Sequence, residues 1–343
     1  MSGVSGWDIG GVNTKAARVI GRRITAVRSR PYEIQRDPAA LAPLLSQLAH
    51  ELGSERDDAH AVTMTAELSQ LFRSKREGVG FVLDAVATAF PETDVQVWGA
   101  DGRWRSPEKA RRDPLAVAAA NWAATARIVG RTYCDCLLID TGSTTSDVIP
   151  IVGGEAVATG RTDLERLREG ELVYTGALRT PAEAIAASVP LGGRATGVSA
   201  EGFALAGDVH LWRGQLEPSD YTAPTPDGRP ATRESAGERL ARVVCADREM
   251  LDAAAISTIA DALWDAQVTR IAESIGRVRA RHPRLRRAVV TGLGDFLAAE
   301  AARRAGLQVT HLSDSFGPAA RHAPAVAVAL LLADERAART VPS

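Results

Sequence analysis

The chain has 343 residues, of which 45% are hydrophobic and 24% charged, and these fractions exclude a disordered, collagen-like or coiled-coil protein. Its 41 basic and 42 acidic residues give a formal net charge of -1, so no overall field attracts nucleic acid or an anionic membrane. The longest apolar stretch, 323–333, is about half as long as a membrane-spanning helix. We therefore expect a cytoplasmic protein without nucleic-acid or membrane partners, and the length predicts two domains.

Two residue types are informative because they are rare. The cysteines are too few for a disulfide framework and lack zinc-finger spacing, which predicts reduced core residues at Cys134, Cys136 and Cys245. The lysines, in a chain that otherwise uses arginine, are Lys15, Lys75 and Lys109. A lysine inside a motif therefore indicates a need for a compact, mobile ammonium group.

The first half of the chain alternates short apolar strands with helical segments. Runs of β-branched residues separated by turn residues predict a meander of three strands, at 4–9, 15–20 and 24–32. Helical spacing and capping residues then predict helix 38–52, strand 61–65, helix 78–90, strand 94–98 and an alanine-rich helix from Asp113 to about Gly130. This alternation predicts an α/β fold.

The strand pattern begins again at Asp135, with strands predicted at 136–140, 147–152 and 155–159. The segment from Asp8 to Lys15 aligns with the segment from Asp140 to Asp147 at an offset of 132 residues, and aspartate, glycine and hydroxyl positions coincide. Self-similarity of this size indicates two related domains rather than a solenoid.

The rest of the chain contains one irregular segment and a third glycine turn. Residues 190–235 are rich in Gly and Pro and are predicted to form an irregular insertion, in which 220–230 form an ordered loop or lid. They are followed by a helical region 232–282 broken near 245–248, strand 288–291, the turn Gly292-Leu-Gly-Asp295, a helix to 305, strand 308–312 and a last helix. We expect a first domain at 1–130 and a second at 131–317, with a C-terminal helix, 318–340, packing back on the first.

The two duplicated turns have the chemistry of phosphate sites. Each follows a strand that ends in aspartate, and its glycines leave backbone N–H groups open to an anion. A carboxylate beside a phosphate repels it unless a magnesium ion lies between them, so Asp8 and Asp140 are predicted to bind Mg²⁺ through its waters. Lys15 would add a point charge for the same phosphates. Each turn taken alone is also compatible with a plain β-turn bearing a surface carboxylate.

The two hairpins and the turn Thr291-Gly-Leu-Gly-Asp295, in this order and spacing, resemble the actin-like superfamily of sugar kinases, chaperone ATPases and actin. The resemblance implies two duplicated ribonuclease-H-like domains with a cleft between them. It also implies that the hairpins hold phosphates and that the third turn holds adenosine.

A narrower resemblance is to the hydantoinase A and oxoprolinase branch, and within it to the condensing enzymes of methanofuran biosynthesis, formerly labelled as linked to tetrahydromethanopterin C1 transfer. The matching segments are 6–15, 64–79, 139–147, 160–181, 246–247 and 291–295. This resemblance implies a transferase of EC 2.5.1 type, in which the phenol oxygen of γ-glutamyltyramine, or of a related phenol, displaces diphosphate from an aminomethylfuran diphosphate. Mg²⁺ is expected, and ATP is not.

Site residues are assigned by position in these motifs. Diphosphate is expected at Gly10, Gly11, Asn13, Thr14, Lys15, Gly142, Ser143, Thr144 and Thr145, with Gly292, Gly294 and Asp295 in the third turn. The expected catalytic residues are Asp8, Lys15, Glu67, Asp140 and Asp147, of which Glu67 and Asp147 are the candidate bases. Substrate is expected at Lys75, Asp163 and Arg179.

Several alternatives remain open. Glu67 also fits a carboxylate at a helix N-terminus, Asp147 a turn cap, and Lys75 a solvated helix face. The wider superfamily favours an ATP-dependent small-molecule kinase, a hydantoinase/oxoprolinase-type amidohydrolase, or a nucleotide-gated protein that is not an enzyme. The sequence leaves a homo-oligomer open as well.

Overall fold

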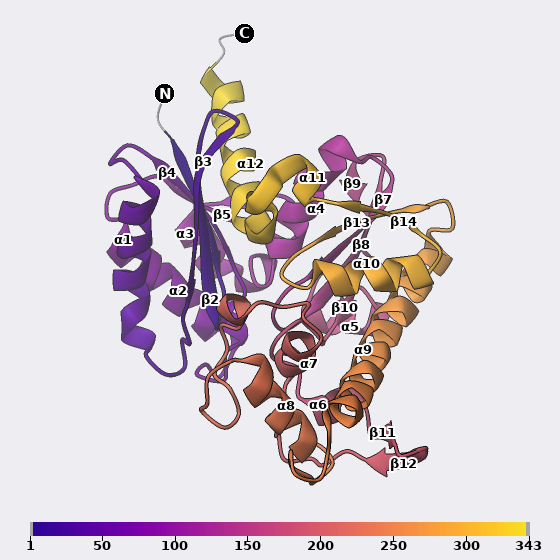
Figure 1. Ribbon diagram of the computed structural model, residues 1–343. Helices are drawn as coiled ribbons and strands as arrows, with labels where there is room; N and C mark the ends of the chain where they lie inside the picture. Colours follow the sequence, from indigo (N-terminus) through magenta and orange to yellow (C-terminus); the bar gives the residue numbers. More distant parts are fainter. Residues whose placement is uncertain (1–2, 341–343) are drawn as a thin grey trace. The chain divides into compact units, whose positions relative to one another are not determined.

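The computed structural model describes residues 3–340 and divides into two compact units (Figure 1). Unit 1 draws on the spans Met1–Asp135, Ile151–Arg166 and Ser313–Ser343, and unit 2 on Cys136–Pro150 and Leu167–Leu312. Residues 151–166 therefore belong to the first unit, although they lie within the predicted second domain.

Unit 1 is built on a six-stranded sheet in the order β3-β2-β1-β4-β5-β6. Its strands are β1 (Val4–Ile9), β2 (Asn13–Ile20), β3 (Arg23–Pro31), β4 (Ala59–Met64), β5 (Val95–Trp98) and β6 (Trp104–Arg105). The predicted meander is confirmed, because β1 and β3 both pair antiparallel with β2. Strand β4 returns parallel to β1 after a helix, and both strands are buried along their whole length.

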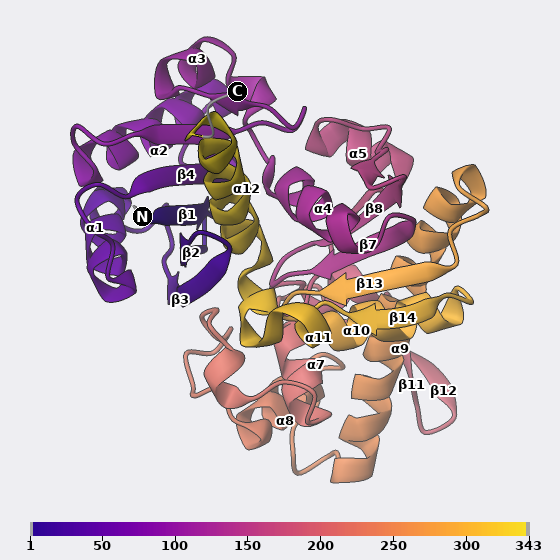
Figure 2. The same ribbon diagram turned by 90° about the horizontal axis from the view of Figure 1, so that it is seen from above.

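Helices cover both faces of this sheet. Helices α1 (Leu41–Leu52) and α2 (Lys75–Ala89) pack on one face, and α4 (Asn121–Thr132) and α12 (Ala323–Thr340) pack on the other (Figures 1 and 2). Helix α12 approaches β1 at Gly6, where an added Cβ would lie 2.1 Å from the carbonyl oxygen of Ala325. The segment Ser313–Arg339 is long and apolar enough to cross a membrane, but 67% of its apolar window is buried in the structure, as in a core helix.

The other short elements of unit 1 connect these layers. They are η1 (Pro38–Ala40), η2 (Ala66–Leu68), α3 (Pro107–Arg112), η3 (Pro114–Ala116), β9 (Glu155–Ala156), α11 (Ser313–Phe316) and η5 (Gly317–His322), and α5 (Asp163–Glu169) begins in this unit. The helix predicted from Asp113 begins only at Asn121. A 3-10 turn and a left-handed residue, Ala119 (φ 48°), interrupt the helical path before it.

Unit 2 repeats the same strand plan. Its sheet has the order β10-β8-β7-β13-β14, formed by β7 (Cys136–Thr141), β8 (Ser146–Val152), β10 (Leu172–Val173), β13 (Arg287–Thr291) and β14 (Gln308–His311). As in unit 1, the first strand is central, its hairpin partner lies on one side, and a later strand, β13, pairs parallel with it on the other. The predicted α/β fold of two duplicated ribonuclease-H-like domains is confirmed.

Helices α9 (Ala253–Arg281) and α10 (Asp295–Arg304) contribute the apolar core against this sheet. The segment predicted to be irregular is so only in part: residues 221–232 form a loop, as predicted, whereas the segment also overlaps the hairpin β11 (Ser188–Leu191) and β12 (Arg194–Gly197), and contains α7 (Ala206–Trp212) and η4 (Pro218–Asp220). Helices α6 (Ala182–Ile185) and α8 (Arg233–Arg242) flank it. Every residue of α7 is buried, because its apolar side chains join a core with α8 and α9. Glycine and proline content alone did not predict this packing.

The cysteines differ in burial. Cys136 is buried in β7, whereas Cys134 and Cys245 are exposed, and all three are free. The prediction that they are core residues is therefore wrong for Cys134, which lies just before β7, and for Cys245, which lies in the turn after α8.

Candidate functional site

The first glycine hairpin joins β1 to β2 in unit 1. The backbone N–H of Gly10 donates to the carbonyl oxygen of Asn13 at 3.0 Å, and a Cβ on Gly10 would lie 2.6 Å from that oxygen, so this turn requires glycine. Asp8, 7% exposed, lies directly opposite Lys15 across the two strands. The hydroxyl of Thr14 and Oδ1 of Asn13 are buried without a hydrogen-bond partner in the described part of the chain. Unsatisfied polar atoms of this kind fit a site that binds a polar ligand.

Glu67 lies in the segment that follows β4, beside this hairpin. The N–H of Thr65 donates to the carbonyl oxygen of Ile9 at 3.0 Å, and the position of a Cβ on Gly11 would lie 3.9 Å from Cα of Ala66. Helix α2 closes over Glu67 at Gly78, where a Cβ would come within 2.6 Å of Cα of Glu67. The glycine therefore allows the close packing that buries the Glu67 carboxyl group.

The Glu67 carboxyl group is buried next to a cation. Its side chain is 0% exposed, and neither carboxylate oxygen has a hydrogen-bond partner among residues 3–340. Nζ of Lys75 lies 3.8 Å from Oε1 of Glu67 and 2.9 Å from Oδ2 of Asp163. Burial raises the pKa of Glu67 from 4.5 to about 7, against the opposing effect of Lys75.

Local sequence explains why Lys75 and Asp163 stand where they do. Ser74 caps α2 by accepting from the N–H of Glu77, so Lys75 is the first residue of the helix. Asp163 begins α5 after a reciprocal cap: Thr162 Oγ1 accepts from the N–H of Glu165, whose carboxylate accepts from the N–H of Thr162. These two caps fix the backbone at both ends of the Lys75–Asp163 ion pair.

Ala119 is a further neighbour of Glu67, and no sequence motif predicts it. Its φ of 48° is unfavourable for a residue with a Cβ. The backbone of Ala119 lowers the pKa of Glu67, although it forms no hydrogen bond of normal geometry with the carboxylate. Strain of this kind is common in functional sites.

The second hairpin, in unit 2, has the same hydrogen bond at the equivalent positions. The N–H of Gly142 donates to the carbonyl oxygen of Thr145 at 2.9 Å, and these residues lie 132 positions after Gly10 and Asn13. The predicted equivalence of the two turns is therefore confirmed by their backbone geometry. The half-buried side chains of Ser143, Thr144 and Thr145 line this turn.

The segment 175–179 packs against the second hairpin and forms backbone hydrogen bonds with it. The N–H groups of Leu178 and Arg179 donate to the carbonyl oxygen of Ser143, at 3.0 and 2.9 Å. A Cβ on Gly176 would lie 2.5 Å from the backbone nitrogen of Thr144, so only glycine fits there. Gln267 of α9 donates to the carbonyl oxygen of Gly176 at 2.8 Å. Arg179, predicted to bind substrate, thus has at least a backbone role at the hairpin.

The third glycine turn lies against Asp140. Gly292 has a φ of 96°, and a Cβ there would lie 2.3 Å from the carbonyl oxygen of Thr141 and 2.5 Å from Oδ1 of Asp140. Gly294 packs on the side chain of Thr141, and Asp295 begins α10, with Oδ2 3.3 Å from Nδ1 of His311. Unit 2 therefore brings Asp140, the second hairpin and the third turn together.

The two units place a carboxylate at equivalent points. Asp8 pairs in register with Thr63, and Asp140 with Thr291. Four residues further on in each unit are Glu67 and Asp295. The carboxyl groups differ in environment, because Glu67 is fully buried whereas the side chain of Asp295 is 37% exposed.

The donor set for a magnesium ion is small. By the internal repeat, Asp147 takes the position of Lys15, so the second hairpin carries carboxylates at 140 and 147 where the first carries Asp8 and an ammonium. Within residues 3–340 there is no group of three or more Asp, Glu, His or Cys that would hold a metal ion. Mg²⁺ keeps several waters and commonly uses one or two carboxylates together with substrate phosphates, and the residues present fit that kind of binding.

The predicted residues thus fall into two groups, one in each unit. Unit 1 brings together Asp8, the first hairpin, Glu67, Lys75 and Asp163, and unit 2 brings together Asp140, Asp147, the second hairpin, Arg179 and the third turn. Sequence reasoning missed Ala119, Gln267 and His322. Burial, and then the nearby Lys15, lower the pKa of His322 to about 4, so this residue lies beside the first hairpin.

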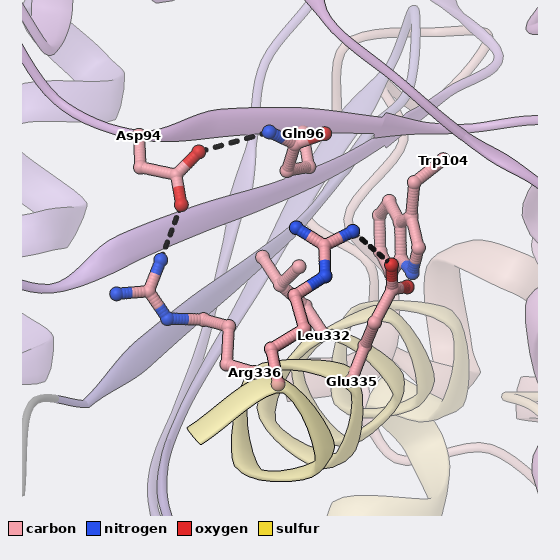
Figure 3. A pocket seen from close by; sticks show the side chains of 7 residues that line it. Asp94, Gln96, Trp104, Leu332, Glu335 and Arg336 are labelled. Atoms are coloured by element: carbon pink, nitrogen blue, oxygen red, sulfur yellow. Dashed lines mark hydrogen bonds and ion pairs between the residues drawn. The ribbon is translucent and has the colours of Figure 1, made fainter. Parts of the chain in front are cut away.

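Three surface pockets of unit 1 lie apart from these groups. The pocket in Figure 3, of about 230 Å³, lies between β5, β6 and α12, and Asp94 pairs there with Arg336 and Gln96. A neighbouring pocket of about 540 Å³ shares Trp104 and Glu335 with it. A third pocket, of about 610 Å³, is lined by Trp98, Trp122 and residues 155–161. None of the three is lined by a predicted site residue.

Comparison with known proteins places this geometry in a family. The model of the hydantoinase/oxoprolinase family matches residues 58–335. The chain is 36% identical over 333 residues to the (4-{4-[2-(gamma-L-glutamylamino)ethyl]phenoxymethyl}furan-2-yl)methanamine synthase of Methanocaldococcus jannaschii, covering 96% of this chain and 97% of the relative. A synthase of the same name from Methanococcus vannielii is 38% identical over 167 residues, 49% of this chain and 74% of that protein.

Among solved structures, the nucleotide-free acetone carboxylase is similar with a TM-score of 0.59 and 11% identity. The match covers 95% of this chain and 70% of the carboxylase chain. At this identity the likeness shows the fold alone.

Proposed function

The chain belongs to the hydantoinase/oxoprolinase family, and from this premise we propose that it is a transferase that forms the aryl ether of a methanofuran precursor. The observation that carries the proposal is the 36% identity to a synthase of that ether over 97% of the synthase's length. In the reaction, the phenol oxygen of γ-glutamyltyramine bonds to the CH₂ of aminomethylfuran diphosphate, the bond from that carbon to diphosphate breaks, and the phenol proton passes to a base. We assign the enzyme to the cytoplasm.

The glycine hairpins support a role in binding the diphosphate. Each is a tight glycine turn of a kind that offers backbone N–H groups to an anion, and the first adds the Lys15 ammonium and the buried hydroxyl of Thr14. Asp8 and Asp140 are the carboxylates that would hold Mg²⁺ through its waters. A bound Mg²⁺ would supply positive charge that stabilises the departing diphosphate.

Glu67 is the better supported of the two candidate bases. Its side chain is 0% exposed and its pKa is raised to about 7, which suits proton transfer near neutral pH. Asp147 lacks this enclosure, because it is half-buried at the start of β8. Leu68 and Leu71, which follow Glu67, are 49% and 39% exposed and offer apolar surface to an aromatic ring.

The test is to combine the purified chain with Mg²⁺, γ-glutamyltyramine and aminomethylfuran diphosphate in the absence of ATP. We expect the ether and pyrophosphate in equal amounts by mass spectrometry and a pyrophosphate assay, and a loss of about 10²- to 10⁴-fold in kcat for Glu67→Gln. Absence of ether together with hydrolysis of added ATP would overturn the proposal and favour the ATP-dependent members of the superfamily.

A further inference from the structure

Glu67 and Lys75 are close but are not paired in the way a buried carboxylate and an ammonium usually are. An ionised carboxylate removed from water normally takes a hydrogen bond from any cation within reach. Here Nζ of Lys75 lies 3.8 Å from Oε1 of Glu67, beyond hydrogen-bond distance, and 2.9 Å from Oδ2 of Asp163. Asp163 has a side-chain exposure of 19%, so the ammonium bonds the more solvated of the two acids.

We propose that Asp163 is a positioning residue that holds the Lys75 ammonium away from direct contact with Glu67, and thereby keeps Glu67 able to accept the phenol proton. This inference rests on the proposed function, because it names what controls the base of that reaction. With Asp163 in place, neither oxygen of Glu67 takes a hydrogen bond from a side chain within residues 3–340, and the backbone groups of Glu67 and Ala119 lower its pKa without forming a hydrogen bond of normal geometry. The ammonium remains near enough to favour the carboxylate form without occupying its lone pairs.

Lys75 and Asp163 are the charged side chains with the largest effect on the pKa of Glu67. The charged groups that perturb its pKa are Lys75, from α2, and Asp163, from α5, and the loop before α4 contributes only the backbone of Ala119. On α2, Arg76 donates to the carbonyl oxygen of Arg111 and Glu77 accepts from the N–H of Arg73. The charges of the adjoining hairpin, Asp8 and Lys15, are not among the largest influences on the pKa of Glu67.

The position of Asp163 is fixed independently of Lys75. Its helix begins with the reciprocal cap of Thr162 and Glu165, and the next turn is anchored by Arg166, which is 2% exposed with its guanidinium 4.5 Å from the ring centre of Trp122. Gly160 lets the chain pass close to Arg166, where a Cβ would lie 2.6 Å from its backbone nitrogen. Removing the Asp163 charge should therefore release Lys75 without moving the backbone of α5.

The two single variants Asp163→Asn and Lys75→Met are expected to shift the pKa of Glu67 in opposite directions, and the double variant separates the two effects. In Asp163→Asn, Lys75 should form a direct ion pair with Glu67 and lower the pKa of Glu67 by about one to three units. The acid limb of the pH profile of kcat should then move to lower pH. Because the base is weaker, kcat above neutral pH should fall. In Lys75→Met, loss of the ammonium should shift the limb up by a similar amount. The double variant should follow Lys75→Met, because Asp163 acts through Lys75. Arg76→Met and Asp84→Asn, on the exposed side of α2, are the matched controls.

A second readout does not need turnover. The titration of Glu67 is followed by ¹³C NMR of protein labelled at glutamate carboxyl carbons, with Glu67→Gln supplying the assignment, and the melting temperature reports whether each variant folds. A lowered Glu67 titration in Asp163→Asn and a raised one in Lys75→Met support the proposal. An unchanged or raised titration in Asp163→Asn, or a double variant that departs from Lys75→Met, overturns it. Failure of the wild-type chain to form the ether would overturn the proposed function while leaving the NMR result interpretable.

Discussion

Replacing Glu67 with glutamine is expected to stabilise the protein at neutral pH while removing its turnover. The pKa of Glu67 in the folded chain is about 7 and its ordinary value is 4.5, so ionisation is less favourable in the folded state than in the unfolded state. Protonation of Glu67 therefore favours the folded state. This contribution to the free energy of unfolding is fully present below pH 4.5, and it is lost as the pH rises through 7. The shift corresponds to about 3 kcal/mol of unfolding free energy, an upper limit for the gain on substitution.

The assay is urea unfolding of the wild type and Glu67→Gln at several pH values between 4.5 and 8.5, followed by tryptophan fluorescence. We expect the variant to gain stability relative to the wild type as the pH rises, with most of the gain between pH 5 and 7.5. The quantity to compare is the difference in the free energy of unfolding between the variant and the wild type. Buried histidines such as His60 and His210 add the same pH dependence to both proteins, because burial lowers their pKa values to about 4. Glu77→Gln, an exposed change on the neighbouring helix α2, is the control.

The reasoning about Glu67 would be refuted by a constant difference between the variant and the wild type across this pH range. Such a result would mean that the carboxyl group is not ionised at a raised pKa in the folded chain. A variant that is less stable than the wild type at pH 8 would contradict it as well. Either outcome would remove the electrostatic argument for Glu67 as the base, and Asp147 would become the leading candidate.

Three further substitutions test other parts of the structure. Asp140→Asn should reduce kcat by orders of magnitude while the melting temperature stays near that of the wild type, because the half-buried carboxylate is assigned to Mg²⁺; a collapse in stability would show a structural role instead. Gly292→Ala should lower activity and Mg²⁺ affinity together, since its Cβ would clash with Asp140 Oδ1 at 2.5 Å, and calorimetric titration with Mg²⁺ checks this. Arg239→Met should cost about 3 to 5 kcal/mol in urea unfolding, because it strands the fully buried Asp208; a loss below about 1 kcal/mol would contradict that burial.

The hairpins could be predicted from the sequence because all the residues of each hairpin are contiguous in the chain. A strand, a glycine turn and a following strand are contiguous, so the sequence predicts both turns, and the structure adds the hydrogen bonds Gly10–Asn13 and Gly142–Thr145 within them. The strand order of unit 1 follows from the same contiguity, since β1 continues into a hairpin and then takes a parallel neighbour, β4, after a helix; in unit 2 the parallel neighbour of β7 is β13, which follows only after helices α5 to α9. Motif order was therefore enough to predict the fold class.

The cluster around Glu67 was not predictable in the same way. Lys75 and Asp163 are 88 residues apart, and they meet because residues 151–166 leave the second half of the chain to join unit 1. The segments 64–79 and 160–181 each carry the narrower family resemblance, but nothing in either sequence predicts that they contact each other. Ala119 gave no signal at all, because its role depends on a backbone conformation that alanine rarely adopts.

The internal duplication gives these observations a common explanation. Glu67 and Asp295 occupy equivalent points in the two units, four residues after a threonine paired with Asp8 or Asp140. In unit 2 this point begins a long helix and its carboxylate contacts His311 near the surface. In unit 1 the helix is reduced to the short turn η2, and Gly78 allows α2 to cover the carboxylate. The carboxylate at this point is thus buried in unit 1 and partly exposed in unit 2. Burial is what raises the pKa of Glu67 to a value suited to accepting a proton near pH 7.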